Sequence, residues 1–130
     1  MIVVDASAAL EVLLQTPAAP RIEAHLFVPG ETLHVPHLLD LEVVHVLRRY
    51  AAAGVIDTRR GLEAIDDLTA WPVTRYPHDL FLARIWVLRH NLTAYDAAYV
   101  ALAEALQATL VTCDTRLAAS VGHRANIALV

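Results

Sequence analysis

The stretch LTAYDAAYVALAEALQATLVTCDTRL, residues 92–117, decides the fold because it predicts a helix, a strand and a second helix with a carboxylate at each junction. Thr93 and Asp96 have the spacing of a capping box that opens a helix, and the alanine-rich sequence after them has apolar residues at helical spacing. Residues 109–113 form a short β-branched run that predicts a strand, and Asp114 is placed to cap the helix after it. This order of elements is typical of an α/β layer.

The N-terminal segment repeats the pattern of a strand that ends on an acid and leads into a helix. The apolar run IVV, residues 2–4, precedes Asp5, and residues 7–15 carry leucine and valine at helical spacing. Further strands are expected over residues 32–35, over 72–77 at a sheet edge and over 126–130, and further helices over residues 17–27, 36–54, 58–71, 78–90 and 115–121. Strands separated by helices predict an α/β fold with a central, mostly parallel β-sheet of about four to five strands flanked by helices.

The length of 130 residues, without linkers or repeats, predicts a single domain over residues 1–130. The hydrophobic fraction of 57% fits a parallel sheet covered on both faces, and it also fits a buried subunit interface. We therefore expect a homodimer or another bound partner. No apolar run reaches the roughly 18 residues that a membrane helix needs, so the expected location is the cytoplasm, with no membrane association.

The basic residues and the cysteine content exclude several classes of site. All ten basic residues are arginine, which excludes the phosphate-binding lysine of P-loop enzymes, any Schiff base and the lysine of a phosphoacceptor pocket. The single cysteine, Cys113, excludes an internal disulfide and a cysteine-based zinc cage. The net charge of -4 is not that of a protein that coats nucleic acid nonspecifically, so a polyanionic substrate would need cations to hold it.

Four acids are expected to meet at one edge of the sheet. Asp5 and Asp114 each follow a strand, and all strands of a parallel sheet end at the same edge. The returning helices start at that edge, which places Glu42 and Asp96 there as well, because both lie near the start of a helix. Each acid alone is equally well explained as a helix cap or a solvated helix residue.

Together the four acids favour a metal site. Like charges so close to one another would repel and raise their own pKa values unless a cation neutralised them. Oxygen ligands without histidine or cysteine favour magnesium, or manganese, over zinc. Such an ion activates a water for hydrolysis of a phosphodiester. The alternatives are a domain that binds RNA or protein without catalysis, and DNA cleavage in the manner of flap nucleases, for which the chain has no helical arch.

Three blocks carry a resemblance to a known family: VVDASAAL at residues 3–10, PHLLDLEVVHVLRR at residues 36–49, and LTAYDAAYVALAEALQATLVTCDTRLA at residues 92–118. They resemble the PIN-domain ribonuclease toxins of bacterial type II toxin-antitoxin pairs, the VapC type. The resemblance covers nearly the whole chain and implies a PIN fold over residues 1–130. It also implies a magnesium- or manganese-dependent endoribonuclease that hydrolyses RNA, and a VapB-type antitoxin that folds onto the toxin and blocks its site.

The resemblance also implies the residues of the site. By position, the acidic set of the family falls on four residues, as catalytic and metal-binding groups: Asp5, Glu42, Asp96 and Asp114. Ser7 and Thr112 stand where the family often carries a hydroxyl that supports the metal or its water. Some members have a further acid just after the last aspartate, but residues 115–117 are TRL here, which leaves fewer ligands for a second metal.

Three other features have competing interpretations. Arg116 lies beside the predicted acidic edge and is the best candidate for an RNA contact. Glu42 and His45 have the E-x-x-H spacing of di-iron bundles, but without a second helical copy we expect His45 to be an ordinary helix residue. The bulky residues within 78–90 favour a core position over a dimer interface; they are Leu80, Phe81, Ile85, Trp86 and Leu88.

Overall fold

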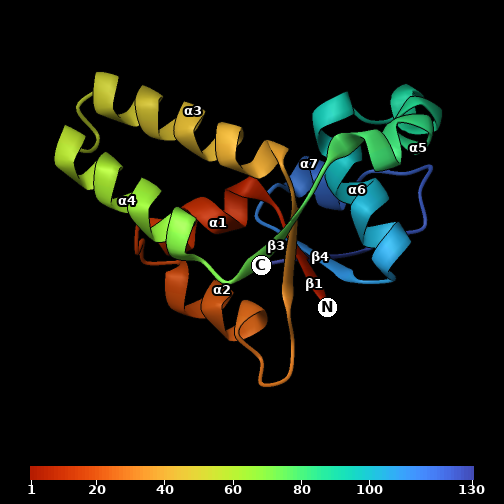
Figure 1. The fold of residues 1–130 in the computed structure, drawn as a ribbon, viewed down its shortest axis with the longest axis horizontal. Coiled ribbons are helices and arrows are strands. Elements are labelled where there is room, and N and C mark those ends of the chain that lie inside the picture. The colour runs from red at the N-terminus through yellow and green to blue at the C-terminus, as the bar shows by residue number, and fades with distance from the viewer.

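The computed structural model describes residues 1–130 as an α/β fold built on one sheet (Figure 1). All neighbouring strands are parallel, and their order across the sheet is β3-β2-β1-β4-β5. The strands are β1 (Ile2–Val4), β2 (Leu33–Pro36), β3 (Val73–Tyr76), β4 (Thr109–Thr112) and β5 (Asn126–Leu129). The predicted α/β class and central sheet are confirmed, and β3 lies at the sheet edge where the two flanking prolines are tolerated.

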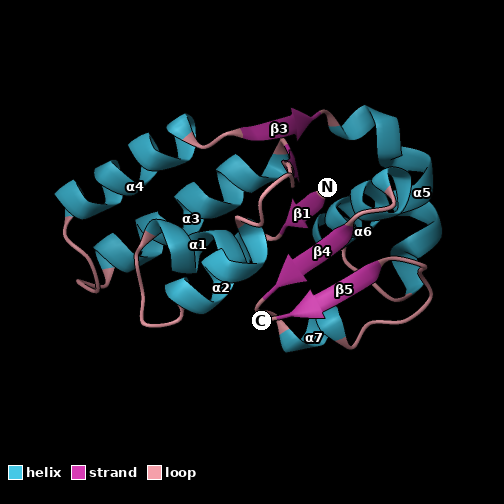
Figure 2. Cartoon of the chain, turned by 90° about the horizontal axis from the view of Figure 1, so that it is seen from below, coloured by secondary structure: helices cyan, strands magenta, loops and turns pink.

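Helices cover both faces of the sheet. They are α1 (Ala6–Leu13), α2 (Ala19–Leu26), α3 (Leu38–Ala52), α4 (Thr58–Ala70), α5 (Leu82–Val87), α6 (Ala94–Leu106) and α7 (Thr115–Ala118). Figure 2 shows α1 to α4 on one side of the sheet and α5 and α6 on the other, as right-handed crossovers require when the strand order reverses after β3. No helix of the structure has both the length and the apolar character needed to cross a membrane.

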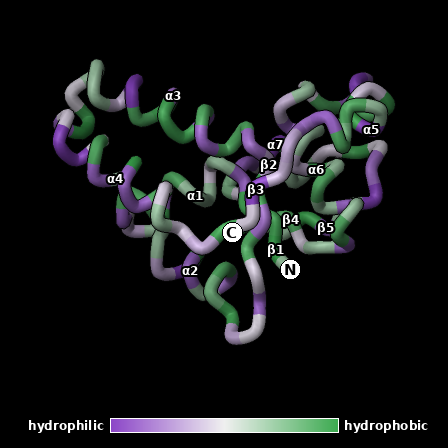
Figure 3. Tube along the Cα trace, in the orientation of Figure 1, coloured by the Kyte–Doolittle hydropathy of each residue, from purple (hydrophilic) through white to green (hydrophobic).

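The core lies along β1 and β4, the two central strands. Val3, Val4 and Leu110 have no exposed surface, and Val3 pairs in register with Leu110. The central strands β1 and β4 and helix α6 are predominantly hydrophobic in Figure 3, whereas the edge strand β3 is more polar. Helix α6 is buried over seven consecutive residues, Ala97–Ala103, because the sheet packs on one of its sides and α5 on the other. This rigid centre fixes the residues that follow β1 and β4.

Two predicted helices are wrong in detail. Residues 78–90 do not form one helix but a 3-10 turn at His78–Phe81, the short α5 and a second 3-10 turn at Leu88–His90. The core position predicted for its bulky residues holds for Leu88, and Phe81 and Ile85 are partly buried against the core. Leu80 and Trp86 are instead 64% and 67% exposed. The helix expected over residues 115–121 ends at Ala118, since Ser120 turns back to hydrogen-bond the carbonyl of Leu117.

Candidate functional site

The four predicted acids lie around one cavity at the carboxyl-terminal edge of the sheet. The cavity has a volume of about 470 Å³, and its lining includes all four. Asp5 follows β1 and Asp114 follows β4, while α3 and α6 bring Glu42 and Asp96 to the same edge. The structure therefore brings the four acids together, as the strand and helix directions expected from the sequence predict.

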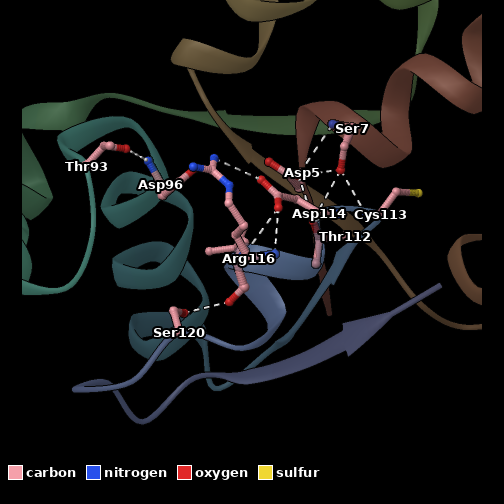
Figure 4. A network of polar contacts seen from close by, with 10 residues as sticks. Asp5, Ser7, Thr93, Asp96, Thr112, Cys113, Asp114, Arg116 and Ser120 are labelled. Atoms are coloured by element: carbon pink, nitrogen blue, oxygen red, sulfur yellow. Dashed lines mark hydrogen bonds and ion pairs between the residues drawn. The ribbon is translucent and has the colours of Figure 1, made fainter.

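Hydroxyl groups hold one oxygen of Asp5. Ser7 Oγ donates to Asp5 Oδ2 at 2.5 Å, and Thr112 Oγ1 donates to the same oxygen at 2.8 Å. Both hydroxyls also accept a backbone N–H, Ser7 from Cys113 at 2.9 Å and Thr112 from Asp114 at 3.0 Å. Figure 4 shows this network joining the start of α1 to the end of β4. Because every side-chain hydrogen bond to Asp5 goes to Oδ2, its Oδ1 is left for another partner.

Asp114 acts as a helix cap and as half of an ion pair. Its Oδ1 accepts the backbone N–H groups of Arg116 and Leu117 at 2.8 and 3.4 Å, which begins α7 as the sequence predicts. Its Oδ2 lies 3.6 Å from Nη2 of Arg116. The Arg116 side chain is 84% exposed and extends over the acidic edge towards Asp114 (Figure 4). A cation of the chain itself therefore already faces this edge.

Glu42 is the most perturbed acid of the site. Burial raises its pKa to about 7, and the negative charges of Asp5 and Asp96 act in the same direction. The nearby Tyr99 hydroxyl lowers the pKa, but by less than the other effects raise it. Glu42 Oε1 is buried without a hydrogen-bond partner of normal geometry. A buried carboxylate oxygen with no partner is unfavourable as a free anion and suits a proton or a cation.

Asp96 stands one helical turn from Tyr99 and shares the electrostatic environment of Glu42. Its backbone N–H donates to Thr93 Oγ1 at 3.1 Å, which caps α6 as predicted. Burial, followed by the charges of Asp5 and Asp114, raises the pKa of Asp96, and Arg116 and Thr93 only partly offset this. Removal of this charge from the cavity would therefore relieve repulsion among the acids.

The four acids do not form a closed set of metal ligands. No group of three or more histidine, cysteine, aspartate or glutamate side chains is arranged to hold an ion. The donor set nevertheless fits a hard divalent cation, because Asp5 Oδ1 is free of side-chain hydrogen bonds and Glu42 Oε1 is buried without one.

The raised pKa of Glu42 predicts a pH-dependent stability. A carboxyl whose pKa is about 7 in the folded state and 4.5 when unfolded binds its proton more tightly in the native protein, so its contribution to stability falls as pH rises from about 4.5 to about 7. In EDTA, the free energy of unfolding of Glu42→Gln minus that of the natural chain should thus be larger at pH 8 than at pH 5. Urea unfolding at both pH values measures this, and an equal difference at both would contradict it.

Sequence reasoning missed part of the cavity, including Glu11 and Tyr50. Its lining also includes Glu11, His45, Arg49 and Tyr50, which extend it along α1 and α3. His45, at the E-x-x-H spacing from Glu42 already considered, lines the cavity but is exposed on α3, as expected of an ordinary helix residue. Cys113 also lines the cavity, and burial, with the charges of Glu11 and Asp5, raises the pKa of its thiol, so it is a poor nucleophile.

Comparison with known sequences gives one consistent family. Residues 2–121 match the PIN domain family. Over its full length the chain is 45% identical to the Mycobacterium tuberculosis protein named ribonuclease VapC12, of which it covers 99%. It is 49% identical over 117 residues to ribonuclease VapC9 of the same organism, a match that covers 90% of this chain and 88% of VapC9.

Solved structures have the same fold. The structure of PAE2754 from Pyrobaculum aerophilum superposes with a TM-score of 0.69 at 29% identity, and the match covers 97% of this chain and 81% of that one. VapC20 from Mycobacterium tuberculosis, described as a sarcin-ricin loop cleaving toxin, superposes with a TM-score of 0.68 at 17% identity. That match covers 95% of this chain and 99% of VapC20, and at such low identity it shows the fold alone.

Proposed function

The chain belongs to the PIN domain family and, within it, to the VapC ribonucleases, and we propose that it is a metal-dependent endoribonuclease that serves as the toxin of a type II toxin-antitoxin pair. The observation that carries the proposal is the single cavity lined by Asp5, Glu42, Asp96 and Asp114. A ribonuclease of this kind meets its substrate in the cytoplasm, the location expected from the sequence.

We propose that the four carboxylates bind magnesium, or manganese in its place. Asp5 through Oδ1, Asp96 and Asp114 would be the principal ligands, with Ser7 and Thr112 as the supporting hydroxyls that keep Asp5 Oδ2 occupied and fix its plane. A bound divalent cation supplies Lewis acidity to the phosphodiester, lowers the pKa of water and offsets charge on the leaving oxygen.

Glu42 has the properties of the base in this reaction. Hydrolysis forms a bond between the water oxygen and phosphorus and breaks the bond from phosphorus to the 3' oxygen, and the attacking water must lose a proton. A carboxylate oxygen can take that proton, and Oε1 of Glu42 is buried without a hydrogen-bond partner. Glu42 serves in this proposal as a ligand or as the group that positions the water.

Arginines on both sides of the acids would hold the flanking phosphates of RNA. Arg116 reaches the edge from α7, and Arg49 lines the far part of the cavity on α3. Guanidinium groups bind phosphate through charge-assisted, bidentate hydrogen bonds, which offsets the acidity of the chain as a whole. Arg116 is therefore the first candidate for an RNA contact, once a divalent cation shares the carboxylate that it now faces.

We also propose two protein partners. One is a cognate VapB-type antitoxin that covers the acidic cavity, in line with the family. A chain of the VapBC2 structure from Rickettsia felis has the same fold, with a TM-score of 0.63 at 12% identity over 91% of this chain and 92% of that one. The other is a second copy of the chain. The exposed apolar residues Leu80, Leu82, Trp86 and Val87 on and before α5 would be covered in such a homodimer, which gives a reason for a composition that is 57% hydrophobic.

The direct test is cleavage of single-stranded RNA by the purified chain, free of antitoxin, in magnesium, in manganese and in EDTA. We expect cleavage with either metal, its loss in EDTA, and its recovery when excess metal is restored, because the carboxylates alone cannot offset charge on the phosphate. Calorimetry with Mn²⁺ should show binding to the same preparation. Undiminished cleavage in EDTA, or no binding of either metal, would exclude the proposal.

A further inference from the structure

Two buried polar atoms next to the acidic cavity have no hydrogen-bond partner of normal geometry. One is Oε1 of Glu42 and the other is the hydroxyl oxygen of Tyr99. Tyr99 lies on α6 with no exposed surface, and it is the largest of the fully buried side chains. A buried hydroxyl without a partner costs about 1–3 kcal/mol, and phenylalanine would fill the same space without that cost. The hydroxyl therefore calls for an explanation outside packing.

The surroundings of Tyr99 indicate its partner. Tyr99 follows Asp96 by three residues, which places both on the same face of α6. The hydroxyl lies within the field of Glu42, Asp5 and Asp96, and it interacts with the Glu42 side chain most strongly of the three. Towards a carboxylate, a phenol hydroxyl can act only as a hydrogen-bond donor.

We infer that Tyr99 is a positioning residue. Its hydroxyl makes no hydrogen bond in the metal-free chain; when the site holds a cation, it donates one to Glu42 Oε1 and fixes that carboxylate in the orientation in which it serves the metal site. The inference rests on the proposed function, since it concerns the same four acids. Tyr99 touches neither RNA nor metal in this arrangement. Its role is that of a side chain that hydrogen-bonds to a metal ligand and fixes the ligand's orientation. Removal of such a side chain weakens metal binding.

Tyr99→Phe tests the inference because it removes only the hydroxyl. Calorimetric titration with Mn²⁺ at pH 8 should show an affinity about tenfold weaker than that of the natural chain. The Tm of the variant in EDTA should be unchanged or higher, because an unpartnered buried hydroxyl has been removed. A merely structural hydroxyl would give the opposite pair of results. Tyr95→Phe is the matched control, since Tyr95 lies on the same helix and is 64% exposed; both its affinity and its Tm should stay unchanged.

A double-mutant cycle with Glu42→Gln shows whether Tyr99 acts through Glu42. The loss caused by Tyr99→Phe should shrink to within about twofold in the Glu42→Gln background if the two groups form one unit. Three outcomes would each overturn the inference: Mn²⁺ binding by Tyr99→Phe within twofold of the natural chain, a lowered Tm of the variant in EDTA, or an undiminished loss in the Glu42→Gln background. If the natural chain itself bound no Mn²⁺, the proposed function would be wrong. If the natural chain and Tyr99→Phe bound Mn²⁺ with the same affinity, only the inferred role of Tyr99 would be wrong.

Discussion

The Asp96→Asn variant should lose RNA cleavage by about 10³-fold or more while keeping its fold. A divalent cation contributes several kcal/mol to the stabilisation of charge in the transition state, and each 1.36 kcal/mol corresponds to a factor of about ten in rate. Asparagine has nearly the same shape, and the cap of α6 is made by Thr93 and the backbone of residue 96, so it is retained. The measurement is initial cleavage rate in magnesium, together with the Tm from circular dichroism.

The stability of this variant provides the sharper part of the test. Because burial and the charges of Asp5 and Asp114 raise the pKa of Asp96, its removal should leave the Tm in EDTA unchanged or higher. Asp66→Asn, on the exposed side of α4 and away from the cavity, is the matched control and should cleave RNA at the natural rate. Cleavage by Asp96→Asn at a rate close to that of the control would contradict a role for this carboxylate in the site.

Leu110→Ala should destabilise the chain by about 2–5 kcal/mol, the usual cost of emptying a fully buried leucine position. Leu110 has no exposed surface and lies in β4 between Val3 of β1 and Ile127 of β5. The measurement is the free energy of unfolding in urea at constant pH. Leu129→Ala on the edge strand β5 is the control; it is 51% exposed and should change stability by less than about 0.5 kcal/mol.

The same substitution should also lower activity at temperatures where the chain is still folded. Strand β4 ends at Thr112, two residues before Asp114, and the hydrogen bond that Thr112 donates to Asp5 ties the strand to the residue after β1. Relaxation of β4 into the space left by Leu110 would displace these groups together. Equal stability of Leu110→Ala and Leu129→Ala would show that the sheet centre is not the core of this fold.

The position of the acids could be predicted from the sequence because it follows from strand direction. Short apolar runs before Asp5 and Asp114 define two parallel strands, and the carboxyl ends of parallel strands share an edge. The family resemblance, carried by the same residues, is confirmed by the match of residues 2–121 to the PIN domain family. Local patterns were sufficient here because each acid directly follows a strand or lies in the first turns of a helix.

The details that depend on tertiary packing could not be predicted. The strand order β3-β2-β1-β4-β5 depends on which helices cover which face, and no single segment encodes it. Trp86 is exposed although a bulky apolar residue usually lies in the core, because α5 turns only one of its sides to α6. Tyr99 is a regular apolar position of its helix in the sequence, and only its burial against Glu42 distinguishes its hydroxyl.

The acidic cavity draws its groups from β1, α3, α6 and β4, which are spread along almost the whole chain. Asp5 and Glu42 therefore emerge from the ribosome well before Asp114. Throughout most of translation the nascent polypeptide therefore has no assembled site. The cavity is complete only when β4 has paired with β1 and has brought Asp114 beside Asp5.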